Sequence, residues 1–167
     1  MRYSIYLYRS GLLIIIILLL NIHGFSQLSI TSTGSNYTIN CDNTVSGVNN
    51  GQYNGSGFTP NPAAGNLDSD AWASTGMTDN LNAGFGTTNI SGDFAKGISN
   101  GGVTAGGFYA FQVTTGDYGF GVQPTDADWT PGTVTLRIIN NTGGNIISID
   151  ISLVCFIGVR SKIEKPD

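Results

Sequence analysis

Histidine is nearly missing from this sequence, and its scarcity limits the chemistry that the chain can perform. The single histidine, His23, lies in the N-terminal leader described below. Without a further imidazole, the remaining chain cannot build a Ser-His-Asp or Cys-His nucleophile pair, and histidine-based zinc sites are excluded as well. The sequence also has no G-x-S-x-G elbow, phosphate-binding loop or dinucleotide-binding glycine pattern. We therefore expect a protein that is not an enzyme.

Basic residues are also few. The chain has 7 Lys and Arg side chains against 11 Asp and Glu, which gives a net charge of −4 at pH 7. No basic cluster precedes Lys96, whereas phosphate binding needs concentrated Lys and Arg. The charge balance therefore argues against nucleic acid as a partner.

Cysteine occurs only at Cys41 and Cys155, near the two ends of the chain that follows the leader. In an oxidising compartment these two residues can form a disulfide. Pairing requires strands from both ends to be neighbours, with Cα atoms within about 7 Å. The alternative is two buried thiols that never meet.

The first 26 residues have the pattern of a secretory signal peptide. Arg2 and Arg9 are positively charged, and residues 11–20 form an unbroken apolar core. Gly24 and Ser26 are the small residues at the −3 and −1 positions of a cleavage site before Gln27. A transmembrane anchor is the alternative, but the apolar run is about half of the roughly 20 residues that cross a bilayer. We expect cleavage after this leader, a secreted or cell-surface location, and no membrane span in the remaining chain.

Glycine is abundant, with 24 residues, and Asn, Ser and Thr are frequent. Helices favour the opposite mixture, so this composition is typical of an all-β, turn-rich extracellular domain. The clearest pattern is a predicted β-hairpin: residues 133–138 and 147–153 alternate between apolar and polar side chains. Between them lies the Asn- and Gly-rich turn at 140–145, which tolerates positive φ.

Other patterns predict further strands, at Tyr37–Cys41, Ala71–Met77, Gly107–Val113 and Tyr118–Gln123. Together they indicate an all-β domain over residues 27–159, an antiparallel β-sandwich of the jelly-roll type. The strongest predicted strand lies close to the C-terminus with no partner after it, so we expect a sandwich that is incomplete there. Residues 160–167 are predicted to be a polar tail.

Four motifs follow one another in a distinctive order: LDSDAW at 67–72, SGDFAKG at 91–97, GGFYAF at 106–111, and the long run from Phe120 to Ser152. This succession resembles the N-terminal β-sandwich region of large secreted or surface proteins of the Bacteroidetes group, in which other modules follow. The resemblance implies the fold and an extracellular place, but the family is poorly characterised and implies no catalytic residues. In that family the last strand continues into a polar segment and further strands, so the apolar residues 153–159 suggest a truncated member.

Two D-x-D steps, Asp68-x-Asp70 and Asp126-x-Asp128, each stand shortly before a tryptophan. In a loop, such a step can aim two carboxylates and a backbone carbonyl at one hard cation, so calcium is the cofactor we consider. The alternative is that these aspartates close Asx-turns where strands begin. A hydrolase that uses an Asp pair would need two carboxyl groups about 5–9 Å apart, and it remains the least favoured alternative.

The two tryptophans suggest different roles. Trp72 lies in an alternating strand and is expected in the core, whereas Trp129 lies in a loop before Pro131 and is the better candidate for an exposed ring that stacks on a sugar. The favoured function is a non-enzymatic structural or binding module of a secreted or surface protein, with an extracellular glycan or protein as partner. A carbohydrate-binding module that uses Trp129 and nearby Asp and Asn groups is the alternative.

Overall fold

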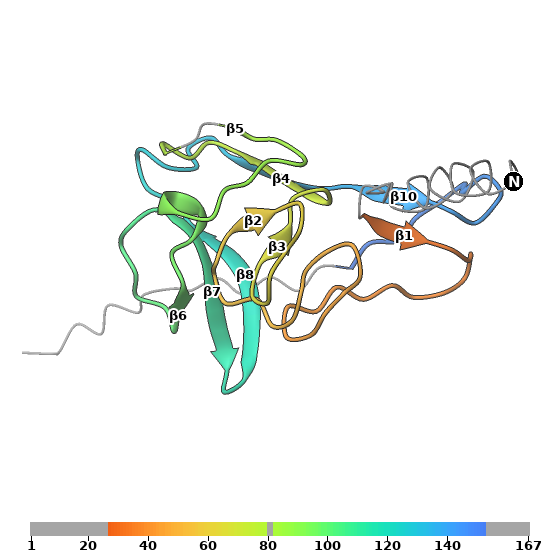
Figure 1. The fold of residues 1–167 in the computed structure, drawn as a ribbon, viewed down its shortest axis with the longest axis horizontal. Coiled ribbons are helices and arrows are strands. Elements are labelled where there is room, and N and C mark those ends of the chain that lie inside the picture. Colours follow the sequence, from red (N-terminus) through yellow and green to blue (C-terminus); the bar gives the residue numbers. More distant parts are fainter. Residues whose placement is uncertain (1–26, 80–81, 153–167) are drawn as a thin grey trace, which may run out of the picture.

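The computed structural model describes residues 27–79 and 82–152, so the predicted signal peptide and polar tail lie outside the described residues. The described residues contain no α-helix, and the predicted all-β class is confirmed (Figure 1). In chain order, the elements are ten strands and one short 3-10 helix: β1 (Leu28–Ile30), β2 (Phe58–Thr59), β3 (Leu67–Asp68), β4 (Trp72–Thr75), β5 (Asn82–Ala83), η1 (Gly92–Phe94), β6 (Ile98–Ser99), β7 (Gly107–Thr114), β8 (Asp117–Gln123), β9 (Thr133–Leu136) and β10 (Ile138–Asn140).

The strands form four small sheets, ordered β1-β10, β2-β3, β5-β4-β9 and β6-β7-β8. The predicted hairpin at 107–123 is confirmed: β7 and β8 pair antiparallel from Gly107 opposite Gln123 to Thr114 opposite Asp117, with an irregularity near Gln112. The predicted strand at 71–77 is present as β4, which pairs antiparallel with β5 and β9. This arrangement is sandwich-like, while the jelly-roll order of strands stays a prediction.

An aromatic core joins these sheets. Phe58 from β2 lies 5.4 Å from Phe108 on β7 and 5.9 Å from Phe120 on β8, measured between ring centroids. Phe94, at the end of η1, lies 5.7 Å from Phe58. Residues 107–110 of β7 are buried in succession, so this strand is covered on both faces, which explains why GFYA does not alternate. Rings from separate sheets thus share one interior.

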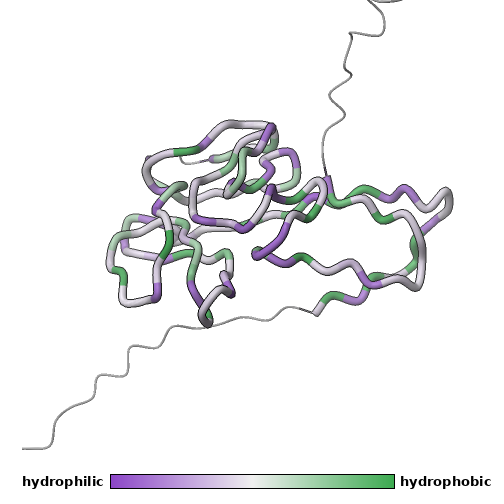
Figure 2. The backbone as a smooth tube through the Cα atoms, turned by 60° about the horizontal axis from the view of Figure 1, so that its bottom comes forward, coloured by the Kyte–Doolittle hydropathy of each residue, from purple (hydrophilic) through white to green (hydrophobic). Residues whose placement is uncertain are grey.

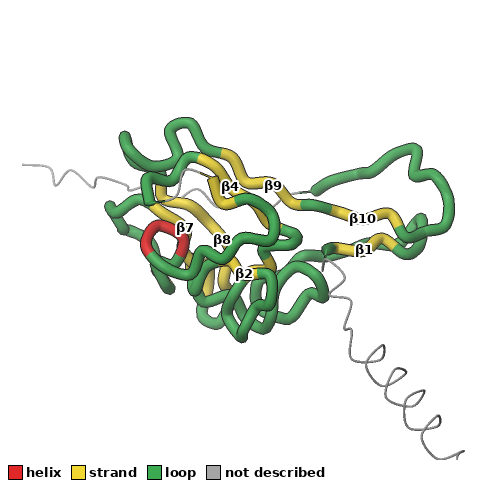
Figure 3. Tube along the Cα trace, turned by 45° about the horizontal axis from the view of Figure 1, so that its top comes forward, coloured by secondary structure: helices red, strands yellow, loops and turns green. Residues whose placement is uncertain are grey.

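The predicted C-terminal hairpin is wrong in its second half. Residues 133–138 divide into β9 and β10, but residues 147–152 form no strand. The Asn- and Gly-rich turn is present, yet β10 pairs instead with β1, in a parallel ladder from Leu28 opposite Ile138 to Ile30 opposite Asn140. In Figure 3 the chain after β10 turns back without becoming a strand. A parallel pair between distant segments has no local sequence signal, so the alternation alone could not reveal it.

The predicted strand at Tyr37–Cys41 is also wrong, because the structure assigns no strand to these residues. A local hydrogen-bond network holds this part of the chain as a loop. The Tyr37 hydroxyl accepts hydrogen bonds from the backbone N–H groups of Thr31 and Ser32, each at 2.9 Å. Side-chain to backbone bonds of this kind give the backbone an alternative to a ladder.

In the parts of the chain that the structure describes, no helix has the length and apolar character needed to cross a membrane.

Replacement of Phe58 by Ala is expected to lower the free energy of unfolding by about 3–5 kcal/mol, because it opens a cavity in the centre of the aromatic core. Chemical denaturation followed by fluorescence measures this. Phe111→Ala is the matched control, since Phe111 is a phenylalanine on β7 that is only half-buried, and its replacement should cost clearly less. Equal losses for the two variants would contradict the central role of Phe58.

Candidate functional site

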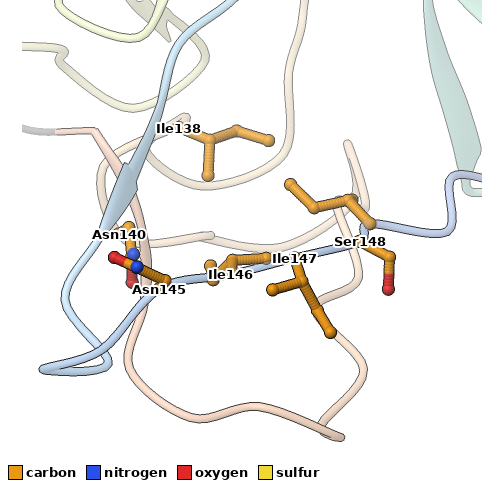
Figure 4. Close-up of a pocket in the computed structure, with 7 residues that line it drawn as sticks. Ile138, Asn140, Asn145, Ile146, Ile147 and Ser148 are labelled. Carbon is orange, nitrogen blue, oxygen red and sulfur yellow. The ribbon is translucent and has the colours of Figure 1, made fainter.

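An open cleft lies between β10 and the chain that returns after it. Its volume is about 800 Å³. Figure 4 shows Ile147 and Ser148 on the returning segment, with Ile138 and Asn140 on β10 across from them. The residues that line the cleft are Ile138, Asn140, Asn145, Ile146, Ile147, Ser148 and Ile149. Isoleucine side chains therefore dominate the lining.

The turn that forms one end of this cleft is fixed by Asn140. Its side-chain oxygen accepts hydrogen bonds from the N–H group of Thr142 at 3.0 Å and from its hydroxyl at 2.8 Å. Its amide donates to the carbonyl oxygen of Gly144 at 2.8 Å. Gly143 has a φ of 77°, in the left-handed region that glycine adopts without steric cost. These contacts reverse the chain, so that the following residues run back past β10.

The returning segment, residues 145–152, is unpaired. None of these residues forms a backbone hydrogen bond to another described residue, and the segment contains no turn or bend. Three of its four isoleucines are open to solvent, with exposed fractions of 97% for Ile147, 60% for Ile149 and 80% for Ile151, while Ile146 is half-buried. Figure 2 shows hydrophobic positions alternating with hydrophilic ones along the arm of the molecule that carries β1 and β10. An exposed apolar surface of this kind is typical of an interaction site.

The predicted cation ligands occupy different environments. Asp68 is buried, and its Oδ1 accepts the N–H of Asp70 at 2.9 Å, which is the Asx-turn that we considered as the alternative. Asp70 is buried, whereas Asp126 is exposed. In residues 27–79 and 82–152, no group of three or more His, Cys, Asp or Glu side chains could hold a metal ion. Calcium binding and the Asp-pair hydrolase stay predictions from the sequence.

Asp128 anchors its loop to Thr78, which lies in the bend after β4. Its Oδ1 accepts the N–H of Thr78 at 3.0 Å and the hydroxyl at 2.7 Å, and its Oδ2 accepts the hydroxyl of Thr125 at 3.2 Å. The carboxylate is buried, and a Cβ at Gly106 would lie only 2.7 Å from its Cγ. The close approach explains why glycine stands at position 106.

A second buried carboxylate, Asp93, meets the same threonine. Its Oδ2 accepts the Thr78 hydroxyl and the N–H of Asp79, each at 3.1 Å, and its Oδ1 lies 3.0 Å from the Lys96 ammonium. Burial raises the pKa of Asp93, but the hydrogen bonds from Lys96, Asp79 and Thr78 outweigh it and hold the pKa below its usual range. Asp93 is thus a charged structural link, and it also raises the pKa of Lys96.

Trp129 packs against the core instead of standing free. It is half-buried, and its Nε1 is buried with no hydrogen-bond partner among the described residues. Its backbone has φ 59° and donates to the carbonyl oxygen of Gly76 at 2.5 Å. The expectation of an open Trp129 ring is therefore not met, and sugar binding there stays a prediction. Trp72 packs against the core as predicted, with its Nε1 donating to Val48 at 3.1 Å.

Cys41 is half-buried with a free thiol, whose pKa is raised by burial. Cys155 lies outside the described residues, so the disulfide between them stays a prediction.

Comparison with protein-family models, curated proteins and solved structures finds no match for this chain. The feature that the sequence-based reasoning missed is the isoleucine cleft. Its signal was the alternation at 147–153, which we interpreted as a buried strand, although it is equally typical of a strand that lacks a partner.

Replacement of Asp128 by Ala is expected to lower the free energy of unfolding by about 1–3 kcal/mol, because the partly buried hydrogen bonds that its carboxylate accepts from Thr78 and Thr125 are lost. Calorimetric melts in calcium and in chelator measure this. Because Asp128 already accepts protein donors, we expect the same loss in both conditions. The matched control is Asp126→Ala at the exposed neighbouring acid. A melting midpoint of the unaltered protein that falls in chelator would instead support the calcium prediction.

Tyr37 is expected to ionise at a lower pH than an ordinary tyrosine. Hydrogen bonds from the hydroxyls of Ser32 and Thr31, and from their backbone N–H groups, lower its pKa to about 8. Ultraviolet absorbance during a pH titration should therefore show one tyrosinate forming with a midpoint of about 8. Ser32→Ala should raise that midpoint while keeping the tyrosine, and Tyr37→Phe should abolish the step. A titration unchanged by Tyr37→Phe would contradict the assignment.

Proposed function

We propose that the chain is a non-catalytic structural or binding module of an exported protein, and that it binds through the cleft at β10. The observation that carries this proposal is the exposed isoleucine surface along residues 147–151. Leaving several isoleucines in water forgoes the roughly 1.5–3 kcal/mol that burial of each such side chain brings. A partner that covers this surface would recover that energy.

The unpaired backbone beside the isoleucines supports the same proposal. Free N–H and C=O groups on a strand-like segment are a template for pairing with another chain. Exposed apolar side chains next to such groups give a partner both hydrogen bonds and hydrophobic contacts. The signal-peptide pattern of residues 1–26 and the motif succession at 67–152 support an extracellular place for this module.

The binding surface is tested with an anilinonaphthalene dye, whose fluorescence rises on apolar surfaces. We expect the folded protein to bind the dye, and Ile147→Ser with Ile149→Ser to remove at least half of the signal while the melting midpoint stays unchanged. Ile90→Ser is the matched control, because Ile90 is 56% exposed but lies outside the cleft lining. A signal that survives the double replacement would refute the proposed surface.

A further inference from the structure

We infer that residues 145–152 form an antiparallel strand pair with the same residues of a second copy of this chain, giving a symmetric dimer. The inference rests on the proposed binding surface and names its occupant. Symmetric two-fold dimers are the commonest oligomers of soluble proteins, and in them one surface patch contacts itself. The sequence NIISIDIS is suited to such self-pairing.

The segment has the length and pattern of a strand. It spans eight residues, within the usual range of 3–10 for strands of globular proteins. Ile147, Ile149 and Ile151 share one face, and Ser148 and Asp150 share the other, if the segment adopts strand geometry. None of its backbone groups is bonded to another described residue, so a strand from outside meets no competitor there.

Side-chain complementarity selects one register. Residues directly opposite each other in an antiparallel pair lie on the same face. If Ile149 lies opposite Ile149 of the second copy, then Ile147 lies opposite Ile151 of that copy, and Ser148 lies opposite its Asp150. Every isoleucine of that face then meets an isoleucine, and the only charged side chain meets a hydroxyl that can donate to it.

The neighbouring registers are worse. Moving the two-fold axis one residue toward the C-terminus, to Asp150, places Asp150 opposite Asp150 of the second copy, and like charges directly opposite are destabilising. Moving the axis one residue toward the N-terminus, to Ser148, places Asp150 opposite Ile146, which leaves the carboxylate without a donor. An axis that passes between two residues places isoleucines opposite polar residues. The two-fold axis is therefore expected at Ile149.

The dimer should be weak. A ribbon of two eight-residue strands is smaller than the 1,200–2,000 Å² that stable interfaces bury, so we expect roughly micromolar dissociation. The net charge of −4 opposes association of two copies, and added salt should therefore strengthen the dimer.

Sedimentation equilibrium of the purified protein over a range of concentrations tests the dimer. Ile149→Asp places two like charges at the axis and should raise the dissociation constant by roughly tenfold or more. Since Ile149 is 60% exposed, its replacement should leave the melting midpoint unchanged. Ile90→Asp, at another exposed isoleucine, should leave the dissociation constant unchanged.

Cysteine cross-linking tests the register. In a background with Cys41→Ser and Cys155→Ser, Ile149→Cys should form a disulfide-linked dimer on mild oxidation. Ile147→Cys alone should not, because position 147 faces 151, whereas a mixture of Ile147→Cys and Ile151→Cys proteins should cross-link. A protein that stays monomeric at all concentrations, or that cross-links equally at 147 and 149, would overturn the inference. If the dye experiment still succeeds, the proposed binding surface stands with another partner.

Discussion

The fold depends on the packing of aromatic rings from separate sheets. The strands are divided among four separate sheets, the largest with three strands each, so backbone ladders alone do not join the sheets to one another. Phe58, Phe94, Phe108 and Phe120 come from different elements and lie within 5.2–5.9 Å of one another where they touch. Burial of such rings is the largest apolar contribution available here, since each buries about 150–250 Å².

Side-chain hydrogen bonds also link separate elements of the fold. Thr78 is the clearest case, because its hydroxyl donates to the carboxylates of Asp93 and Asp128 and so brings η1 and the 125–130 loop to the same bend after β4. Three of the four distinctive motifs meet around it: SGDFAKG contributes Asp93 and Lys96, GGFYAF contributes Gly106, and the long C-terminal motif contributes Asp128. Asp93 and Asp128 therefore have a structural explanation that requires no ligand.

The sequence predicted those elements whose interacting residues are close together along the chain. The β7–β8 hairpin and β4 were predictable, because their strand-forming residues and the turn residues beside them are neighbours in the sequence. The parallel pairing of β1 with β10 was not, since more than a hundred residues separate Leu28 from Ile138. The same limit applies to the site. The D-x-D spacing of Asp126 and Asp128 is visible in the sequence, but the donors of Thr78 that engage Asp128 come from a distant segment.

The open segment at 145–152 is a consequence of that distant pairing. Hairpin formation after the Asn140 turn would be the local outcome, and the alternating isoleucines favour it. With β1 hydrogen-bonded along β10 and Asn141 donating to Ile30 at 2.7 Å, the arm is stabilised without the returning segment. The isoleucines that a hairpin would half-bury are then left in water, beside a backbone with unused donors and acceptors. A strand from another molecule would cover the isoleucines and pair with the unused backbone groups at the same time. Binding is therefore expected at the unpaired segment.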